Sequence, residues 1–120
     1  MDNTAFKRQL ISRAFTFARN VIKLVDDFPS KRAAWVIADQ LLRSATSIGA
    51  NIMEAQAASS RKDFINFLNH ALKSANETKF WLALAKDIAP RKREEIEKLL
   101  KEVDELARIL GSSVKSLKKT

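Results

Sequence analysis

The sequence lacks several residue types that particular kinds of site require. Its 120 residues include no cysteine, one histidine, two glycines and two prolines. Without cysteine there is no disulfide framework, no thiolate metal site and no cysteine nucleophile. With His70 as the one histidine, neither a histidine-based metal centre nor a histidine-activated nucleophile is expected. Scarce glycine and proline argue against the many tight turns of a β-rich fold, so we expect a helical protein with no metal and no cofactor.

Long hydrophobic runs are missing too. No run of about 18 apolar residues occurs, so neither a membrane-spanning segment nor a membrane partner is expected. The first residues, MDNTAFKRQLISR, lack the apolar core of a secretory signal. Together with the absence of cysteine, this favours a soluble protein of the cytoplasm. The length favours a single domain over residues 1–120, large enough to bury its own core.

Basic residues outnumber acidic ones. The chain carries 22 lysines and arginines against 14 aspartates and glutamates, which gives a formal net charge of +8. Such a balance favours a polyanionic partner, such as a nucleic-acid backbone, an acidic protein or an anionic lipid surface. A charge that serves only solubility explains the same balance equally well. The positions of the basic residues are therefore needed to decide between a polyanionic partner and solubility.

Apolar residues recur with helical spacing in four segments, 4–27, 31–57, 61–89 and 91–118. Pro29 ends the first segment, and Ser30 is expected to cap the second. Ser60 is expected to cap the third, with Asp63 in its first turn, and Pro90 suits the opening turn of the fourth. Long helices joined by short loops pack most simply as an antiparallel up-down-up-down bundle. The sequence therefore predicts an all-α four-helix bundle.

The first segment has more apolar surface than a bundle core needs. Its main stripe includes Leu10, Phe17 and Leu24. A second stripe lies beside it and consists of Ile11, Phe15, Ala18, Ile22 and Val25. A bundle needs one stripe from each helix, and a second one would leave a contiguous apolar patch in water. We predict that the second stripe is the interface of a homo-oligomer; the alternative is that the first helix lies centrally in an irregular bundle.

Basic residues gather in three places that are candidates for phosphate contacts. On the first segment, which has no acid between positions 3 and 25, Arg8, Arg19 and Lys23 lie opposite the main stripe. Two further clusters flank the predicted loops and are expected at opposite ends of the bundle: Arg61 with Lys62, and Arg91 with Lys92 and Arg93. A solvated basic face has the same pattern. Because the aromatic residues lie at apolar positions, binding is expected through the phosphate backbone and not through base stacking.

The acids of the last segment give no sign of an active site. Glu94, Glu95 and Glu97 are too close along one helix to converge on a point. They are better explained as members of ion pairs on a solvent-exposed helix face. The expected i,i+4 pairs are Glu94–Lys98, Glu97–Lys101 and Asp104–Arg108.

The middle of the chain holds further charged pairs. An antiparallel hairpin that turns near residue 59 places Arg43 near Glu77 and Asp39 near Lys79, and it lets Glu54 and Glu77 face each other. Two glutamates without histidine partners do not make a di-metal site of the bundle type. Interhelical ion pairs that set the register of the helices explain these groups better, so we expect no enzyme.

Residues 42–82 carry a more specific pattern. They read LRSATSIGANIMEAQAASSRKDFINFLNHALKSANETKFWL, in which SIGANIMEAQ is followed by DFI and ETKFWL. This segment resembles the bacterial four-helix-bundle family that includes proteins encoded within intervening sequences of 23S ribosomal RNA genes. The resemblance implies an up-and-down bundle that assembles into a homopentamer, with no assigned catalytic residues. Gly49 and Ala55 stand where proline and glycine are common in the family.

The family is also similar to the accessory variability-determinant proteins of diversity-generating retroelements, which are positively charged pentameric barrels. That similarity implies nucleic acid and a reverse transcriptase as candidate partners. The motif residues themselves are expected to be structural: Arg43, Ser47, Asn51, Glu54, Ser74, Glu77 and Trp81. We expect a non-catalytic, homo-oligomeric basic scaffold that binds RNA or DNA. The alternative is a protein–protein adaptor that docks an acidic partner and has no nucleic-acid role.

Overall fold

The computed structural model describes residues 3–119, which form four long α-helices and one short 3₁₀ turn, with no strand in that range. The elements in chain order are α1 (Asn3–Asp26), α2 (Arg32–Gln56), α3 (Arg61–Ile88), η1 (Pro90–Lys92) and α4 (Arg93–Lys118). The all-α prediction is confirmed, and the helix ends lie within one or two residues of the predicted ones.

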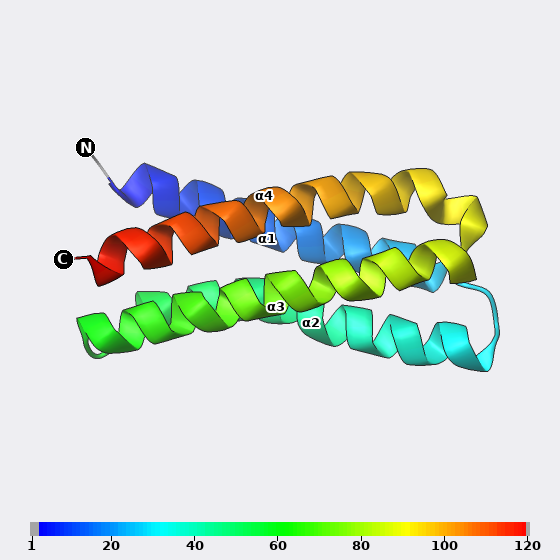
Figure 1. The fold of residues 1–120 in the computed structure, drawn as a ribbon, viewed down its shortest axis with the longest axis horizontal. Coiled ribbons are helices and arrows are strands. Elements are labelled where there is room, and N and C mark those ends of the chain that lie inside the picture. Colours follow the sequence, from blue (N-terminus) through cyan, green and yellow to red (C-terminus); the bar gives the residue numbers. More distant parts are fainter. Residues whose placement is uncertain (1–2, 120) are drawn as a thin grey trace.

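The helices run antiparallel and form an elongated bundle of 47 × 23 × 20 Å (Figure 1). Each helix packs beside its neighbours in the chain, and α1 also packs beside α4, so the bundle closes. Both chain ends lie at the same end of the bundle as the α2–α3 turn, and we call this the terminal end (Figure 1). The α1–α2 and α3–α4 connections lie at the opposite end, which we call the far end.

The start of α3 follows its predicted capping, whereas the start of α2 does not. Ser60 caps α3, because its hydroxyl accepts the backbone N–H of Asp63 at 3.0 Å. The prediction that Ser30 caps α2 is wrong. Lys31 is the residue before α2, and its carbonyl accepts the N–H of Trp35 at 3.0 Å. A hydrogen bond of 2.9 Å from Lys31 N–H to the Pro29 carbonyl tightens the turn and leaves Ser30 outside the cap position.

One apolar core runs along the bundle and takes a stripe from every helix. The largest side chains that are fully buried in it come from all four helices and include Phe17, Leu41, Ile48, Ile52, Leu82, Ile96, Leu106 and Leu110. The main stripe of α1 is buried from Leu10 to Leu24, while Phe6 near the helix start is exposed. Among the described helices, none has the length and hydropathy needed to cross a membrane.

Candidate functional site

The motif residues form a line of polar contacts along the seam between α2 and α3. Ser74 on α3 and Ser47 on α2 hydrogen-bond through their hydroxyls at 2.9 Å. The side-chain amide of Asn51 donates to the Ser47 carbonyl at 2.9 Å and to its hydroxyl at 3.0 Å. One helical turn further on, the fully buried hydroxyls of Ser44 and Thr78 meet at 3.0 Å. These contacts join the two helices, and no buried side-chain polar atom of the described residues lacks a hydrogen-bond partner.

A second group on the seam is built around Glu77. The indole N–H of Trp81 donates to Glu77 Oε2 at 2.8 Å, and the guanidinium of Arg43 binds the same oxygen from α2. Arg43 Nη2 also donates to Gln40 Oε1 at 2.8 Å. The Trp81 hydrogen bond, assisted by Arg43, lowers the pKa of the Glu77 carboxyl below its usual range. Glu77 thus connects a donor on its own helix with one on α2, which is typical of a structural group.

Glu54 lies apart from this group. It is exposed, and it makes no side-chain hydrogen bond or ion pair with any residue that the structure describes. The Arg43–Glu77 contact fixes the register of α2 and α3, and Glu54 lies eleven residues further along α2 than Arg43, at a rise of about 1.5 Å per residue. The expectation that Glu54 and Glu77 face each other is therefore wrong. The two glutamates form no joint site.

Two further sequence-based pairings are replaced by contacts between α3 and α4. Lys79 Nζ pairs with Asp104 Oδ1 at 3.1 Å and not with Asp39, because Lys79 points to the opposite side of α3 from Glu77. Lys86 Nζ binds Glu97 Oε1 at 3.0 Å, so Glu97 is engaged across the helices and not with Lys101. Of the i,i+4 pairs expected within α4, the described structure contains Asp104–Arg108, at 3.0 Å.

The basic residues of α1 lie on two sides of the helix, one exposed to solvent and one in contact with α4. Arg8, Arg19 and Lys23 are all exposed, and the Arg19 guanidinium lies 5.9 Å from the centre of the Phe15 ring. Arg13, by contrast, donates to Glu102 on α4 at 2.7 and 3.0 Å and lies 3.3 Å from Glu105. The hydrogen bond to Glu102 raises the Arg13 pKa. The neighbouring helix thus supplies acids to a part of α1, positions 3–25, that has none, but only on the side of Arg13.

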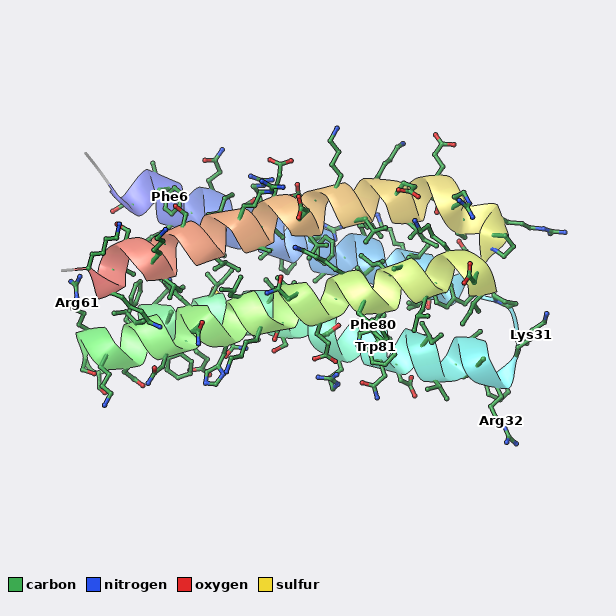
Figure 2. All side chains as sticks on the ribbon, in the orientation of Figure 1. Phe6, Lys31, Arg32, Arg61, Phe80 and Trp81 are labelled. Carbon is green, nitrogen blue, oxygen red and sulfur yellow. The ribbon has the colours of Figure 1, made fainter. Side chains whose placement is uncertain are left out.

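The two basic loop clusters lie at opposite ends of the bundle. Arg61 and Lys62 begin α3 at the terminal end, where Arg61 Nη2 donates to the Leu117 carbonyl at 3.0 Å (Figure 2). At the far end, Lys92 Nζ binds Asp27 at 3.0 Å and Glu95 at 3.4 Å, and the hydrogen bond to Asp27 raises its pKa. Arg91 and Arg93 beside it are exposed.

Sequence reasoning missed two cations at the far end, Lys31 and Arg32, which project from the start of α2 (Figure 2). Their position directly after the predicted loop at Pro29 could have indicated that they lie at the far end. Acids offset most of the positive charge at this end, where Lys86, Arg91, Lys92 and Arg93 lie as well: Asp26, Asp27, Asp87, Glu94 and Glu95. At the terminal end the described acids are Glu54 and Asp63, and the cations that outnumber them are Lys7, Arg8, Arg61, Lys62, Lys115, Lys118 and Lys119. The positive charge of the bundle is therefore concentrated at its terminal end.

The second apolar stripe of α1 lies on the surface of the protomer. Phe15 is 63% exposed and Ile22 is 45% exposed, while Ile11, Ala18 and Val25 are half-buried at the edge of the core. The interface expected on these residues is thus available for contact. A central position of α1 in an irregular bundle does not agree with the exposure of Phe15 and Ile22.

α2 extends this apolar surface with two residues that sequence reasoning did not single out as interface. A Cβ placed on Gly49 of α2 would lie 3.5 Å from the Cβ of Ala14, which fixes how α1 and α2 meet. Trp35 is 61% exposed and Met53 is 55% exposed, and both lie on the outer side of α2 toward α1. We call Phe15, Ile22, Trp35 and Met53 the α1/α2 apolar face.

A smaller apolar patch lies around the next helix pair. Val36 on α2 and Phe80 on α3 are both more than half exposed. The Phe80 ring packs edge-on against Trp81, with 5.1 Å between the ring centres (Figure 2). The helical positions of Val36 and Phe80 place them on the outer side of the α2–α3 seam. We call Val36 and Phe80 the α2/α3 patch.

Comparison with known proteins identifies the family of the chain. Residues 7–112 match the family described as 23S rRNA-intervening sequence protein. The chain belongs to this family. A crystal structure at 1.70 Å of a protein with unknown function, from the S23 ribosomal protein family of Bacteroides thetaiotaomicron, is similar with a TM-score of 0.80 and 40% identity. The similarity covers 88% of this chain and 98% of that one. No curated protein matches significantly.

The family resemblance first noted on residues 42–82 is thereby confirmed, and in the structure those residues form the α2–α3 seam. The motif residues form two groups of contacts on this seam, one of Ser47 with Asn51 and Ser74 and one of Glu77 with Arg43 and Trp81. No group of three or more metal-ligating side chains occurs among the described residues. The exposed features that can meet a partner are the basic terminal end, the basic face of α1 and the two apolar surfaces.

Proposed function

We propose that this member of the family is a non-catalytic, homo-oligomeric scaffold of the cytoplasm that binds RNA or DNA through phosphate contacts. The observation that carries the proposal is the uneven distribution of charge along the bundle. Lysines and arginines from the start of α1, the start of α3 and the end of α4 gather at the terminal end, where acids are few. Phosphate backbones are recognised by such clusters with little regard to sequence.

The face of α1 that carries Arg8, Arg19 and Lys23 adds to this surface. Arg8 lies near the terminal end, and the other two continue along α1 toward the far end. All three side chains are exposed. Arg91, Lys92 and Arg93 are weaker candidates, because acids surround them and Lys92 is held by Asp27 and Glu95. The terminal end and the outer face of α1 are therefore the proposed polyanion surface.

Assembly is supported by the apolar surfaces of the protomer. The α1/α2 apolar face presents large side chains from two helices, and contiguous exposed apolar surface of this kind marks interaction sites. The α2/α3 patch lies on a different side of the bundle from the α1/α2 apolar face, so the protomer has two different apolar surfaces. A contact between two different surfaces is heterologous and generates a closed ring when its rotation closes. Five is the number of subunits that the family resemblance implies.

A ring of this kind repeats the terminal end of each protomer around one axis. Repetition of a basic cluster strengthens its field and increases the attraction of a polyanion. In the proposed ring, the apolar contacts hold the subunits together, and this places their basic terminal ends next to one another. A reverse transcriptase is a candidate protein partner of such a scaffold on the family resemblance.

The proposal is tested by binding of single-stranded RNA, double-stranded RNA and double-stranded DNA to the purified protein across a salt series. Affinity should fall steeply as salt rises, because each phosphate contact releases counterions, and the slope of log K against log salt reports how many contacts form. Absence of binding at low salt contradicts the nucleic-acid function. A nuclease-resistant complex with one acidic protein would then favour the adaptor function.

A further inference from the structure

A cavity of about 940 Å³ opens into the bundle at its terminal end. All four helices line it. Its floor is formed by core side chains, namely Leu10, Ile52, Leu68 and Leu110, which are all at least nine-tenths buried. Phe6 and Phe64 form part of its wall. Its volume is within the range of pockets that enclose small organic ligands, about 300–1,000 Å³. None of the contacts proposed for nucleic acid uses this apolar floor.

The charged residues in the lining of the cavity are all cationic. Its lining includes Lys7, Arg61 and Arg108, and it contains no aspartate or glutamate. Lys7 Nζ lies 5.7 Å from the centre of the Phe64 ring, so a cation is held over the wall of the cavity. The Arg108 side chain is 79% exposed, with Asp104 as the partner of its Nε at 3.0 Å. A bound molecule thus meets an apolar interior and a cationic rim.

We propose that this cavity binds a single-tailed amphiphilic anion, a long-chain carboxylate being the simplest example. The alkyl chain occupies the apolar interior against Leu10, Leu68 and Leu110. The carboxylate lies at the rim, where Lys7 and Arg108 donate charge-assisted hydrogen bonds to it. A neutral apolar ligand leaves these cations unused, and a cationic amphiphile is repelled by them. A double-tailed lipid or an extended polyanion does not match one cavity with one charged rim.

The proposal shares Lys7 with the proposed polyanion surface, but its apolar interior and Arg108 lie outside that surface, so binding of the amphiphile and binding of nucleic acid can fail separately. The probe is sodium dodecanoate, used below the concentration at which it forms micelles and followed by isothermal titration calorimetry. Dodecyltrimethylammonium has the same chain with the opposite charge, and butyrate has the same head group with a short chain. Together they separate the contribution of the tail from that of the charge.

Two variants locate the site. Lys7→Gln with Arg108→Gln removes the cationic rim, and Lys98→Gln with Lys101→Gln removes the same charge from an exposed face of α4 outside the cavity. Ser112→Phe places an aromatic ring in the cavity from an exposed position on its lining, so it blocks the site without changing the core. Helical circular dichroism and the thermal unfolding midpoint check that each variant folds.

We expect one dodecanoate per subunit and no measurable binding of butyrate or dodecyltrimethylammonium. The rim variant should bind dodecanoate about tenfold more weakly, because it loses two exposed charge contacts and each contributes roughly fivefold or less to the affinity. The Lys98/Lys101 variant should bind it unchanged, and the Ser112→Phe variant should lose binding. No binding of dodecanoate overturns the proposal. Equal binding of the anionic and cationic amphiphiles, or equal affinities in all the variants, also overturns it, because the cationic rim then has no role.

Discussion

The hydroxyl groups of Ser44 and Thr78 meet at 3.0 Å inside the apolar core, and neither side chain is exposed to solvent. Each hydroxyl also has a partner in its own helix, because Thr78 bonds to the Ser74 carbonyl at 2.7 Å and Ser44 contacts the Leu41 carbonyl at 3.3 Å. The pair thus connects α2 to α3 at one defined register. A shift of either helix would leave a buried hydroxyl without its cross-helix partner.

This relationship predicts the effect of removing one hydroxyl. Thr78→Val keeps the shape of the side chain and should lower the free energy of unfolding by about 1 kcal/mol, since the Ser44 hydroxyl loses its interhelical partner. Adding Ser44→Ala should cost less than the sum of the single changes, because no lone polar group then remains. Urea denaturation of the single and double variants measures both quantities.

Thr46→Val is the matched control for this prediction. Thr46 is exposed, and its hydroxyl bonds to the Leu42 carbonyl at 2.7 Å within the same helix, with no partner on another described helix. Its replacement should change the unfolding free energy by less than about 0.5 kcal/mol. If Thr78→Val and Thr46→Val have the same effect, the interhelical bond does not contribute to stability.

The fold could be predicted from the sequence because it depends on regular signals. Helical periodicity and the positions of Pro29, Ser60 and Pro90 located four helices to within a few residues. Ser30 was misplaced because the backbone bond between Lys31 and Pro29, a feature of the folded turn, moves the helix start by one residue. Sequence patterns report which residue types favour a cap, but not how tightly the preceding turn closes.

The candidate surfaces were only partly predictable, since they depend on which helices become neighbours. The pairing of Arg43 with Glu77 follows from the hairpin alone and was found as expected. The engagement of Arg13 by Glu102, from the other end of the chain, needs the α1–α4 contact. The same is true of Lys79 and Asp104, and of the cavity that the terminal end encloses. Local spacing contains no information on these contacts.

The contacts of Glu77 predict a pH dependence of stability. Its pKa in the folded protein lies below the unfolded value of 4.5, so in the window between these values the unfolded state binds more protons and stability rises with pH. The stabilisation by Glu77 should be complete above pH 4.5 and lost as the pH falls through its folded pKa. Glu77→Gln should therefore be less stable than the wild type at pH 7, with a difference that shrinks on acidification.

Asp39→Asn is the control for the Glu77 prediction. Asp39 is an exposed acid of α2 and makes no ion pair with the described residues. Urea denaturation at pH values from 7 down to 3 should show a nearly constant difference between this variant and the wild type. A Glu77→Gln difference that is equally constant over the same range contradicts a role for the charged carboxylate.

Gly111, inside α4, predicts a gain in stability. A Cβ at this position would lie 3.9 Å from both Cδ atoms of Leu72, which is ordinary van der Waals contact. Gly111→Ala should therefore stabilise the protein by about 0.8–1 kcal/mol, the difference in helix propensity. Gly49→Ala should gain less, because its Cβ meets the Cβ of Ala14 at 3.5 Å. Thermal unfolding of the two variants tests the order, and a lower midpoint for Gly111→Ala contradicts it.

The α1/α2 apolar face predicts the effect of a single charge on assembly. Phe15→Asp should reduce the particle mass measured by analytical ultracentrifugation, because the charge would have to be desolvated in the interface. Its helical circular dichroism should stay the same, since Phe15 is mostly exposed in the protomer. Thr16→Asp adds the same charge on the next, exposed residue of α1, on another side of the helix, and should leave the mass unchanged. Loss of helical signal with unchanged mass would place Phe15 in the core.

The two ends of the bundle differ in charge, and this difference predicts unequal effects on nucleic-acid binding. Lys115→Gln with Lys118→Gln removes two cations of the terminal end, where the described acids are few. Arg91→Gln with Arg93→Gln removes two cations of the far end, where Asp27, Asp87 and Glu94 already lower the local potential. Both double variants change the net charge equally, so a response to total charge would be the same in each.

If nucleic acid binds at the terminal end, the two double variants should differ in how strongly they bind it. Each lost phosphate contact reduces the slope of log K against log salt by about 0.7–0.9, so the terminal-end variant should lose roughly 1.5 from the slope and bind all sequences more weakly. The far-end variant should keep a slope close to that of the wild type. Equal losses in both would show that the whole surface attracts the polyanion and that the terminal end is no particular site. A larger loss at the far end would move the proposed surface to the connections between the helices.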